Sequence, residues 1–582
     1  MAYVPGRLLT GLLVPLQLAN LFFGHSECQA IICGWRLGSS VAVLKDTLYV
    51  IGGWTIAQKE SQTDLGSSER RVLSIPLWRS WSVGDAIFQE HANSKFGGAE
   101  DVSLWSSPDE TKIYTWGGRD IQPTSTSYSR FPRLRTFTPA SAHVGNGQGA
   151  WEAEVDPPRD LDKMPPQRIY RTASGSWTSC NGFGFYMGGE LSKETDLTWP
   201  YRTSDDNERL DLEGLVIYDM NSKKWTNQSV VDIGGGAFRA SHTGETAVCL
   251  PTLGTEGKGV LLFFGCFYGL GQGPAVGTEE VLLYDIGKSK FHIQQTTGDI
   301  LAPRALHCAV AAKAVNSKGY EIILFGGLKQ IPAQTYVLMV PGFHWFREDH
   351  KPPSSMQGAR SSHACAVVGR GGRQMIAVGG IDIDWPGNFW WRQDPWGNGV
   401  QVLDMTNLTW SGEYKHDAPN YEQPKVAKEW YSDVANAKNI QWNTNETRAL
   451  FADAIDSLAG DPTYPPSGPL VGMIVGTAIS VPAALAVIAV CIVYFCYYRP
   501  RCQRREQEGG YVLPFELLQP QNPVEVEADH YNTGPNDKTS HNREWEQELE
   551  VSQPMLDMLQ RASVQPRVWS PSLDFHRGRR VR

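Results

Sequence analysis

Short apolar runs separated by polar loops recur through residues 34–414, and six of these runs end in a glycine pair or its equivalent. The runs are rich in Val, Ile, Leu, Phe and Tyr, which predicts β-strands bounded by turns rather than helices. Successive first glycines are 53 to 77 residues apart. The six positions are Gly52-Gly53, Gly117-Gly118, Gly188-Gly189, Gly265-Cys266, Gly326-Gly327 and Gly379-Gly380.

Two further features repeat with the glycine pairs. A polar loop and a second apolar run follow each pair, and an aromatic residue closes the unit, as in residues 215–225. A first strand precedes each pair and often opens with Arg and His, as in Arg304-Ala-Leu-His307 and Arg360-Ser-Ser-His363. The closing aromatic residues are Trp81, Trp151, Trp225, Phe291, Trp345 and Trp410.

This unit closely resembles the kelch repeat. The resemblance implies an all-β fold, a six-bladed propeller with one four-stranded blade per repeat around a channel. In that fold the glycine pair ends the second strand, where a positive φ or the close approach of another backbone is needed. The aromatic residue packs between neighbouring blades. The layout of the whole chain is similar to that of membrane-anchored kelch-repeat surface proteins, fungal examples included.

The sequence leaves the closure of the ring open. In blade one, residues 39–44, 47–51, 71–77 and 78–83 are expected to form the four strands in order. Blade six ends either on its own strand at 408–414 or on a strand at 30–35, which closes the ring with the N-terminus.

The two ends of the chain predict a single-pass type I protein of the plasma membrane. Residues 1–30 have the layout of a secretory signal peptide. Residues 470–498 contain no charge and exceed the about 20 residues that a helix needs to cross a bilayer. Arg499 and Arg501 follow at once, and positive charge stays on the cytoplasmic side. The propeller at 31–414 and a stalk at 415–469 are therefore expected outside, and the tail at 499–582 inside.

The flanking segments carry their own predictions. Three N-glycosylation sequons lie on the outer side, at Asn227, Asn407 and Asn445. In the stalk, residues 423–437 and 445–459 have helix-compatible spacing, and they either dock against the propeller or form a loose spacer. The tail is polar, so we expect it to be mostly disordered and to bind cytoplasmic partners.

Composition narrows the class of function. The chain has 582 residues, and its 58 Gly and 20 Trp fit many turns and strands rather than a helical protein. A net charge of −9 argues against a nucleic-acid binder.

Disulfides are permitted but not assigned among the outer cysteines, and core packing is favoured over bridging for Cys308 and Cys365. The outer cysteines are Cys33, Cys180, Cys249, Cys266, Cys308 and Cys365.

The chain contains no G-x-S-x-G, no H-E-x-x-H and no phosphate-binding loop motif. His242, His307 and His363 recur at equivalent repeat positions, so we interpret them as blade residues rather than metal ligands. Galactose-oxidase-like copper radical oxidases also carry kelch propellers, but no full ligand set aligns and no segment accommodates their further domain. We expect no cofactor, no metal and no catalytic residue.

The loops that follow the glycine pairs emerge on one face of a propeller, and several are long and aromatic here. Exposed aromatic residues beside Asp and Arg favour contact with a protein or a carbohydrate, although the same tryptophans also suit packing of a loop against the propeller. The candidate ligand-binding residues are Trp54, Arg119, Tyr268, Lys329, Trp385, Trp390, Trp391 and Trp396. We expect a non-enzymatic interaction module. The alternatives are a copper radical oxidase and a purely structural surface protein.

Overall fold

The computed structural model describes residues 35–460 except for 57–66, 70, 86, 94–98, 121–133, 141–148, 158–168, 193, 197–208, 231–241, 244–245, 266, 269–276, 316, 329–332, 350–355, 357 and 383–393. The predicted signal peptide at 1–30, membrane span at 470–498 and tail at 499–582 lie outside the described residues. Of the helices that are described, none combines the length and the apolar character needed to cross a bilayer.

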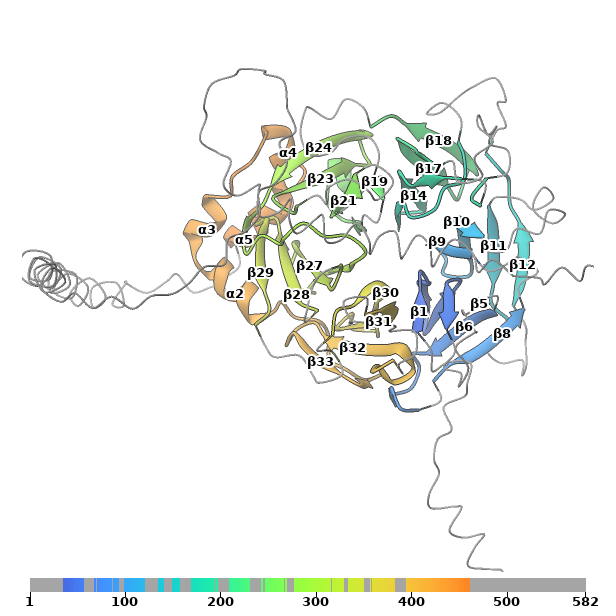
Figure 1. The fold of residues 1–582 in the computed structure, drawn as a ribbon. Coiled ribbons are helices and arrows are strands. Elements are labelled where there is room, and N and C mark those ends of the chain that lie inside the picture. The colour runs from blue at the N-terminus through green and yellow to red at the C-terminus, as the bar shows by residue number, and fades with distance from the viewer. Residues whose placement is uncertain are drawn as a thin grey trace, which may run out of the picture. The chain divides into compact units, whose positions relative to one another are not determined.

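The described chain forms a ring of six blades, each built on four antiparallel strands (Figure 1). The innermost strand of every blade contacts the innermost strand of the next, and the sixth contacts the first, so the ring is closed. The predicted all-β, six-bladed propeller is therefore confirmed.

Blades one to three follow each other along the chain. The strands of blade one, from the channel outward, are β2 (Ser40–Leu44), β3 (Thr47–Ile51), β6 (Arg71–Pro76) and β8 (Gln89–Asn93). Those of blade two are β9 (Ala99–Ser106), β10 (Ile113–Asp120), β11 (Arg135–Thr138) and β12 (Ala150–Ala153). Those of blade three are β13 (Ser176–Cys180), β14 (Phe183–Met187), β17 (Leu215–Asp219) and β18 (Lys224–Gln228).

Blades four to six repeat the arrangement. The strands of blade four are β20 (Thr246–Leu250), β21 (Val260–Phe264), β23 (Glu280–Asp285) and β24 (Lys290–Gln295). Those of blade five are β26 (Cys308–Ala312), β27 (Tyr320–Phe325), β28 (Thr335–Val340) and β29 (His344–Arg347), with the parallel strand β25 (Thr297–Gly298) outside them. Those of blade six are β30 (Ser361–Val368), β31 (Gln374–Ile381), β32 (Val400–Asp404) and β33 (Thr409–Ser411).

Short strand pairs and 3-10 turns lie in the loops that connect the strands of the blades. Paired two-residue strands in the loops of blades three and four are β15 (Glu190–Leu191) with β16 (Leu210–Asp211), and β19 (His242–Thr243) with β22 (Phe267–Tyr268). The 3-10 turns are η2 (Thr255–Gly257) and η5 (Gly397–Gly399).

The ring closes where the first and last blades meet. Blade six has its own outer strand, β33, as one alternative predicted. Strand β1 (Trp35–Leu37) also crosses the seam, because it pairs with β31 and with β4 (Trp54–Ile56), which in turn pairs with β5 (Ser67–Ser68). The predicted fourth strand of blade one at 78–83 was wrong. Its β7 (Trp81–Ser82) pairs instead with β34 (Glu413–Tyr414) across the seam, and β8 takes the outer position.

The glycine pairs, or Gly265 in blade four, directly follow the second strands of blades one, three, four and five, as predicted, whereas in blades two and six the second strands β10 and β31 continue one or two residues past the pair. The structure shows why glycine is needed at these positions. Gly326 has a φ of +71°, and a Cβ atom on it would lie 2.4 Å from the carbonyl oxygen of Arg360 in the next blade. The next residue, Gly327, donates its N–H to that same oxygen at 2.8 Å. The pair is thus the point at which the backbone of one blade docks on the backbone of its neighbour.

The same docking contact recurs around the ring. Gly53 donates to the carbonyl of Ala99 at 2.9 Å, and Gly118 donates to the carbonyl of Thr172 at 2.9 Å. At the seam, Gly380 of blade six pairs with Arg36.

The closing aromatic residues pack between blades, as the resemblance implied. Trp225 of blade three lies 4.6 Å, between ring centroids, from Trp116 of blade two. Trp410 of blade six lies 4.4 Å from Phe325 of blade five. The core is therefore not one central mass but a series of apolar layers, one at each blade interface.

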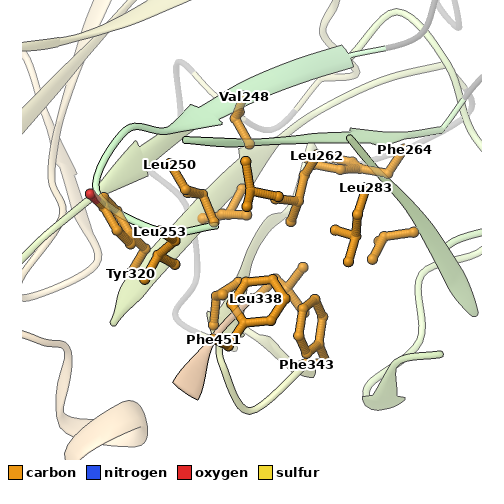
Figure 2. Packing of buried hydrophobic residues seen from close by; sticks show 14 of the residues in the cluster. Val248, Leu250, Leu253, Leu262, Phe264, Leu283, Tyr320, Leu338, Phe343 and Phe451 are labelled. Carbon is orange, nitrogen blue, oxygen red and sulfur yellow. The ribbon is translucent and has the colours of Figure 1, made fainter. Parts of the chain in front are cut away.

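The segment after blade six folds back onto the propeller. Its helices are α2 (Lys425–Ser432), α3 (Val434–Lys438), α4 (Asn445–Ala449) and α5 (Ala452–Gly460), and they lie beside β24 and β29 (Figure 1). Phe451, between α4 and α5, enters the apolar layer of blades four and five, where its ring lies 5.1 Å from that of Phe343 (Figure 2). Of the two predicted alternatives for this segment, docking is the one observed.

Polar contacts hold the same segment from its start. The buried Glu321 of β27 accepts hydrogen bonds from the Tyr421 hydroxyl at 2.9 Å and from the Gln423 amide at 2.6 Å. The backbone N–H of Gly254 donates to the carbonyl of Leu450 at 2.9 Å. We call residues 421–460 the C-terminal clamp, because they contact both blade four and blade five.

Replacing Gly326 by Ala tests the docking contact. The added Cβ meets the Arg360 carbonyl and adopts a φ that costs about 1–2 kcal/mol in an L-residue, so we expect a loss of at least about 2 kcal/mol in the free energy of unfolding. Gly84→Ala is the matched control, since nothing lies within 4 Å of a Cβ there. Denaturant unfolding followed by tryptophan fluorescence measures both. Equal stabilities would refute the role assigned to the pair.

Candidate functional site

A cavity of about 350 Å³ occupies the channel along the axis of the propeller. Residues from the innermost strands of all six blades form its wall, with Asp101 of β9 as the contribution of blade two, together with turns that precede the strands. Its surface is mixed, with serine and threonine hydroxyls, small apolar side chains, one tryptophan, two histidines and one aspartate. The lining residues include Gly38, Asp101, Ser174, Trp177, His307 and His363.

One end of the cavity is rimmed by residues in the left-handed backbone conformation. They occupy the same repeat position, two residues after the carbonyl that docks on the preceding glycine pair. We call them the mouth ring: Gly38, Asp101, Ser174, Leu306 and Ser362, with φ values from 53° at Asp101 to 62° at Gly38.

Backbone hydrogen bonds run around the mouth ring from blade to blade. The Ser362 N–H donates to Leu306, the Gly38 N–H donates to Ser362, and the Asp101 N–H donates to Gly38, at 2.9, 3.2 and 2.9 Å. The Ser174 hydroxyl then donates to Oδ2 of Asp101 at 2.9 Å. The mouth is therefore a fixed frame built from main-chain groups, and it holds the Asp101 carboxylate at its edge.

Two disulfides join the innermost strands of neighbouring blades. Cys180 of blade three is bonded to Cys249 of blade four, and Cys308 of blade five is bonded to Cys365 of blade six. The preference for core packing over bridging at Cys308 and Cys365 was wrong. The cysteines are far apart in sequence but lie on adjacent first strands, because the ring brings consecutive inner strands side by side. Their shared position on first strands was the signal available from the sequence.

The histidines at equivalent repeat positions are packing residues. The ring of His307 stacks on Phe264 of blade four at 5.8 Å, and the ring of His363 lies 5.3 Å from Phe325 of blade five. Burial, together with the charge of a nearby arginine, lowers the pKa of each histidine to about 3. Both are therefore neutral near pH 7. The third, His242, pairs with Tyr268 between β19 and β22.

Buried arginines tie the loops after the glycine pairs to the blades. Arg36 contacts Glu69 at 3.4 Å within the seam region, and Arg360 makes two hydrogen bonds to Asp394, at 2.9 and 2.8 Å. Breaking such a pair leaves an uncompensated charge inside the protein, which strongly lowers the free energy of unfolding. These contacts therefore fix the positions of the loops.

Three of the predicted ligand-binding residues are part of this buried framework. Trp54 is 3% exposed, Arg119 is 5% exposed and Trp396 is 3% exposed, which corrects the expectation that they line an exposed rim. Arg119 bonds to Glu190 at 2.9 Å, and Trp396 lies under the Arg360 guanidinium at 3.7 Å from its ring centroid. Pairing across loops, which the sequence did not reveal, withdraws these side chains from the surface.

Of the other predicted ligand-binding residues, the structure describes only Tyr268. Tyr268 lies in β22, shortly after β21, which is the second strand of blade four. Lys329, Trp385, Trp390 and Trp391 lie outside the described residues.

The three sequons fall on peripheral elements. Asn407 is exposed in the turn between β32 and β33, and Asn445 is exposed at the start of α4. Asn227 is half-buried on the outer strand β18.

Within the described part of the chain, no group of three or more His, Cys, Asp and Glu side chains is arranged to hold a metal ion.

The six blades, their docking glycines and the interblade aromatic residues define a kelch-type β-propeller, which confirms the resemblance seen in the sequence. A kelch repeat-containing protein of Arthroderma benhamiae is 24% identical over 467 residues, covering 71% of this chain and 62% of that protein. The chain thus spans less than two thirds of the length of this relative. No family model matches the chain.

The neutral histidines predict how stability depends on pH. An unfolded histidine takes up a proton near pH 6.5, but folded His307 does so only near pH 3, so acidification across this window favours unfolding. The contribution is fully present above pH 6.5 and is lost as the pH falls toward 3. In His307→Phe, which keeps an aromatic ring against Phe264, we expect the slope of unfolding free energy against pH to fall by up to about 1.4 kcal/mol per pH unit.

Reversible denaturant unfolding at several values between pH 4 and pH 7 measures this slope. Trp78→Phe, an exposed and non-titrating aromatic substitution, is the control and keeps the wild-type slope. A His307→Phe slope equal to that of the wild type would show that His307 is protonated equally in both states.

Proposed function

We propose that the chain is a single-pass type I protein of the plasma membrane. Its propeller lies outside the cell and binds a protein or a glycan, and its tail couples to cytoplasmic partners. The kelch-type propeller supports an interaction module in general terms. The membrane placement is supported by the signal-peptide layout of residues 1–30 and the uncharged run at 470–498.

The observation that carries the outward placement is the pair of interblade disulfides. Cys180–Cys249 and Cys308–Cys365 each close a chain segment within the channel wall. Disulfides form and persist in oxidising compartments and are rare where thiols are kept reduced. A propeller held by two of them is suited to the secretory route and the cell surface, on the side of the membrane where the three sequons also lie.

The binding role rests on the face that carries the mouth ring and the loops after the glycine pairs. Loops positioned by a rigid scaffold are where propellers and other β-folds carry their contacts. The loop at 383–393 holds Trp385, Trp390 and Trp391, and aromatic side chains of this kind dominate protein and carbohydrate contacts. The relative's printed name specifies no ligand, so the class of partner is argued from these residues alone.

A non-enzymatic role is part of the same proposal. The arginines, histidines and cysteines that are described near the channel are engaged in ion pairs, aromatic packing and disulfides, which are structural uses of reactive side chains. The alternative of a copper radical oxidase has a decisive measurement. Stoichiometric copper with an organic radical in the purified protein would overturn the binding-only function.

Expression of the full chain in a eukaryotic secretory host tests the placement. We expect a band shift on treatment with a peptide N-glycosidase, loss of that shift in Asn227→Gln/Asn407→Gln/Asn445→Gln, and labelling of the intact cell by an impermeant biotin reagent. Alkylation before and after reduction, followed by peptide mapping, is expected to protect the four channel cysteines until reductant is added. Unglycosylated protein with four reactive thiols would refute the outward placement.

The aromatic loop is tested with the double variant Trp390→Ala/Trp391→Ala. Partners captured on the cell surface by cross-linking to wild type, or glycans bound on an array, are expected to lose at least about tenfold in affinity, the scale of a central aromatic contact. Trp78→Ala is the control, because Trp78 is an exposed tryptophan outside this loop. Binding unchanged in the double variant would remove the loop from the site.

A further inference from the structure

The C-terminal clamp begins on a buried acidic side chain. Glu321 of β27 is 0% exposed, and its Oε2 accepts the Tyr421 hydroxyl at 2.9 Å while its Oε1 accepts the Gln423 amide at 2.6 Å. Tyr421 is itself 2% exposed, and its backbone N–H donates to the carbonyl of Gly371 in blade six at 2.8 Å. The first residues of the clamp are therefore held at the junction of blades five and six, and two of their contacts converge on one carboxyl group.

No positively charged side chain among the described residues pairs with this carboxyl group, and both of its hydrogen-bond donors are neutral. In the blade, its cross-strand neighbours are Ala312 and Met339. From the clamp, the charge that acts on it is that of Lys428 on α2, and this ammonium bonds instead to Glu422 at 2.8 Å. A buried carboxylate without a cation is costly, whereas the protonated acid avoids that cost.

Docking of the clamp is therefore coupled to a proton on Glu321. Burial raises the pKa of Glu321 to about 7, and the hydrogen bonds from Gln423 and Tyr421 limit the rise. When the start of the clamp leaves, water reaches the carboxyl group, and its pKa returns toward the usual value of 4.5. The docked form thus binds the proton more tightly than the released form. Docking is consequently strongest below pH 4.5, weakens as the pH rises through 7, and is weakest above it.

We propose that Glu321 is a proton-operated latch for the start of the C-terminal clamp, residues 421–432. With its carboxyl group protonated, this segment docks on blades five and six, and with the group ionised the segment is held less tightly. The end of the clamp lies outside this control, because Trp442 and Phe451 pack on Phe343 through apolar contacts alone. A rise in pH therefore loosens the start of the clamp while its end stays docked.

Other titratable groups contact the same segment. Trp430 of α2 stacks on His344 of blade five with 5.3 Å between ring centroids, and burial lowers the pKa of His344. Its effect runs in the opposite direction, because protonation of His344 below its usual pKa of 6.5 weakens docking. Burial raises the pKa of Tyr421 well above 10, so this phenol stays protonated near neutral pH. The part due to Glu321 is therefore the difference between the wild type and a variant that lacks only this carboxyl group.

Hydrogen exchange of the full chain in mild detergent, followed by mass spectrometry between about pH 5.5 and 8.5, tests the latch. Protection factors correct for the intrinsic pH dependence of exchange, so they report how often residues 421–432 open. A docked pKa of about 7 and a released pKa of 4.5 predict a wild-type protection factor on the order of tenfold higher at about pH 5.5 than at about pH 7.5. Residues 445–460 are expected to change little over the same range.

Two variants separate the latch from a purely structural contact. Glu321→Gln keeps the size of the side chain and removes its charge, so we expect the fall in protection with rising pH to disappear. Tyr421→Phe removes a donor to the ionised carboxylate, which raises the pKa of Glu321 further, so the midpoint of the fall is expected to move to higher pH. Glu429→Gln is the matched control, because that carboxylate is exposed on α2, and it is expected to keep the wild-type profile.

A wild-type protection factor in residues 421–432 that stays constant or rises with pH would overturn the latch. So would a fall in Glu321→Gln equal to that of the wild type. If Glu321→Gln does not fold, Tyr421→Phe decides the matter, and an unmoved midpoint in that variant would refute the role of Glu321. None of these measurements uses a binding partner or depends on the membrane placement, so their outcome is independent of the proposed function.

Discussion

The structure depends on one contact that is repeated around the ring, in which a main-chain carbonyl of one blade docks on the glycine pair of the blade before it. At Gly326 and Gly327 the contact combines a hydrogen bond of 2.8 Å with an approach that excludes any side chain. The contact also sets the backbone that follows. Two residues beyond each docked carbonyl the chain adopts the left-handed conformation and enters the mouth ring. The blade interface and the channel mouth are therefore two consequences of one local geometry.

Buried ion pairs and disulfides reinforce this backbone frame at particular blade interfaces and loops. Arg36 and Arg360 each bury a guanidinium against an acid from the loop that it anchors. The disulfides cross the interfaces of blades three with four and five with six. These buried ion pairs and interblade disulfides are structural features that hold loops and blades in place.

Much of the fold follows from the sequence, because the features that define a blade are local. The glycine pairs and closing aromatic residues such as Trp225 and Trp410 are recognised by residue type and spacing, and they do what the kelch resemblance implied. Features that depend on distant partners were missed. Residues 78–83 pair with a strand more than 300 positions away in the chain, and Cys308 meets Cys365 only because successive first strands adjoin.

In the candidate site, too, features that depend on distant partners could not be predicted from the sequence. Trp396 sits in a loop rich in tryptophan, and only the position of Arg360 reveals that its ring is covered. Asp101 has no distinguishing neighbours in the sequence, and its place at the channel mouth comes from a left-handed backbone conformation and from Gly38, whose lack of a side chain leaves room for the Asp101 carboxylate. Whether a polar side chain is satisfied is a property of its three-dimensional surroundings, which a single sequence does not display.

The C-terminal clamp gives the propeller a direction of mechanical strength. Force applied to the chain beyond Gly460 is transmitted through Phe451 and Leu450 to blades four and five. From there the two disulfides carry it to blades three and six, so four consecutive blades resist the pull as one body. The seam between blades six and one has no disulfide among the described residues; it is held by strand pairs and by an apolar layer in which Trp81 stacks on Tyr414. The contacts of the clamp described above are made with blades four and five rather than with this seam. A propeller anchored in this way keeps its closure out of tension when the chain that follows it is held.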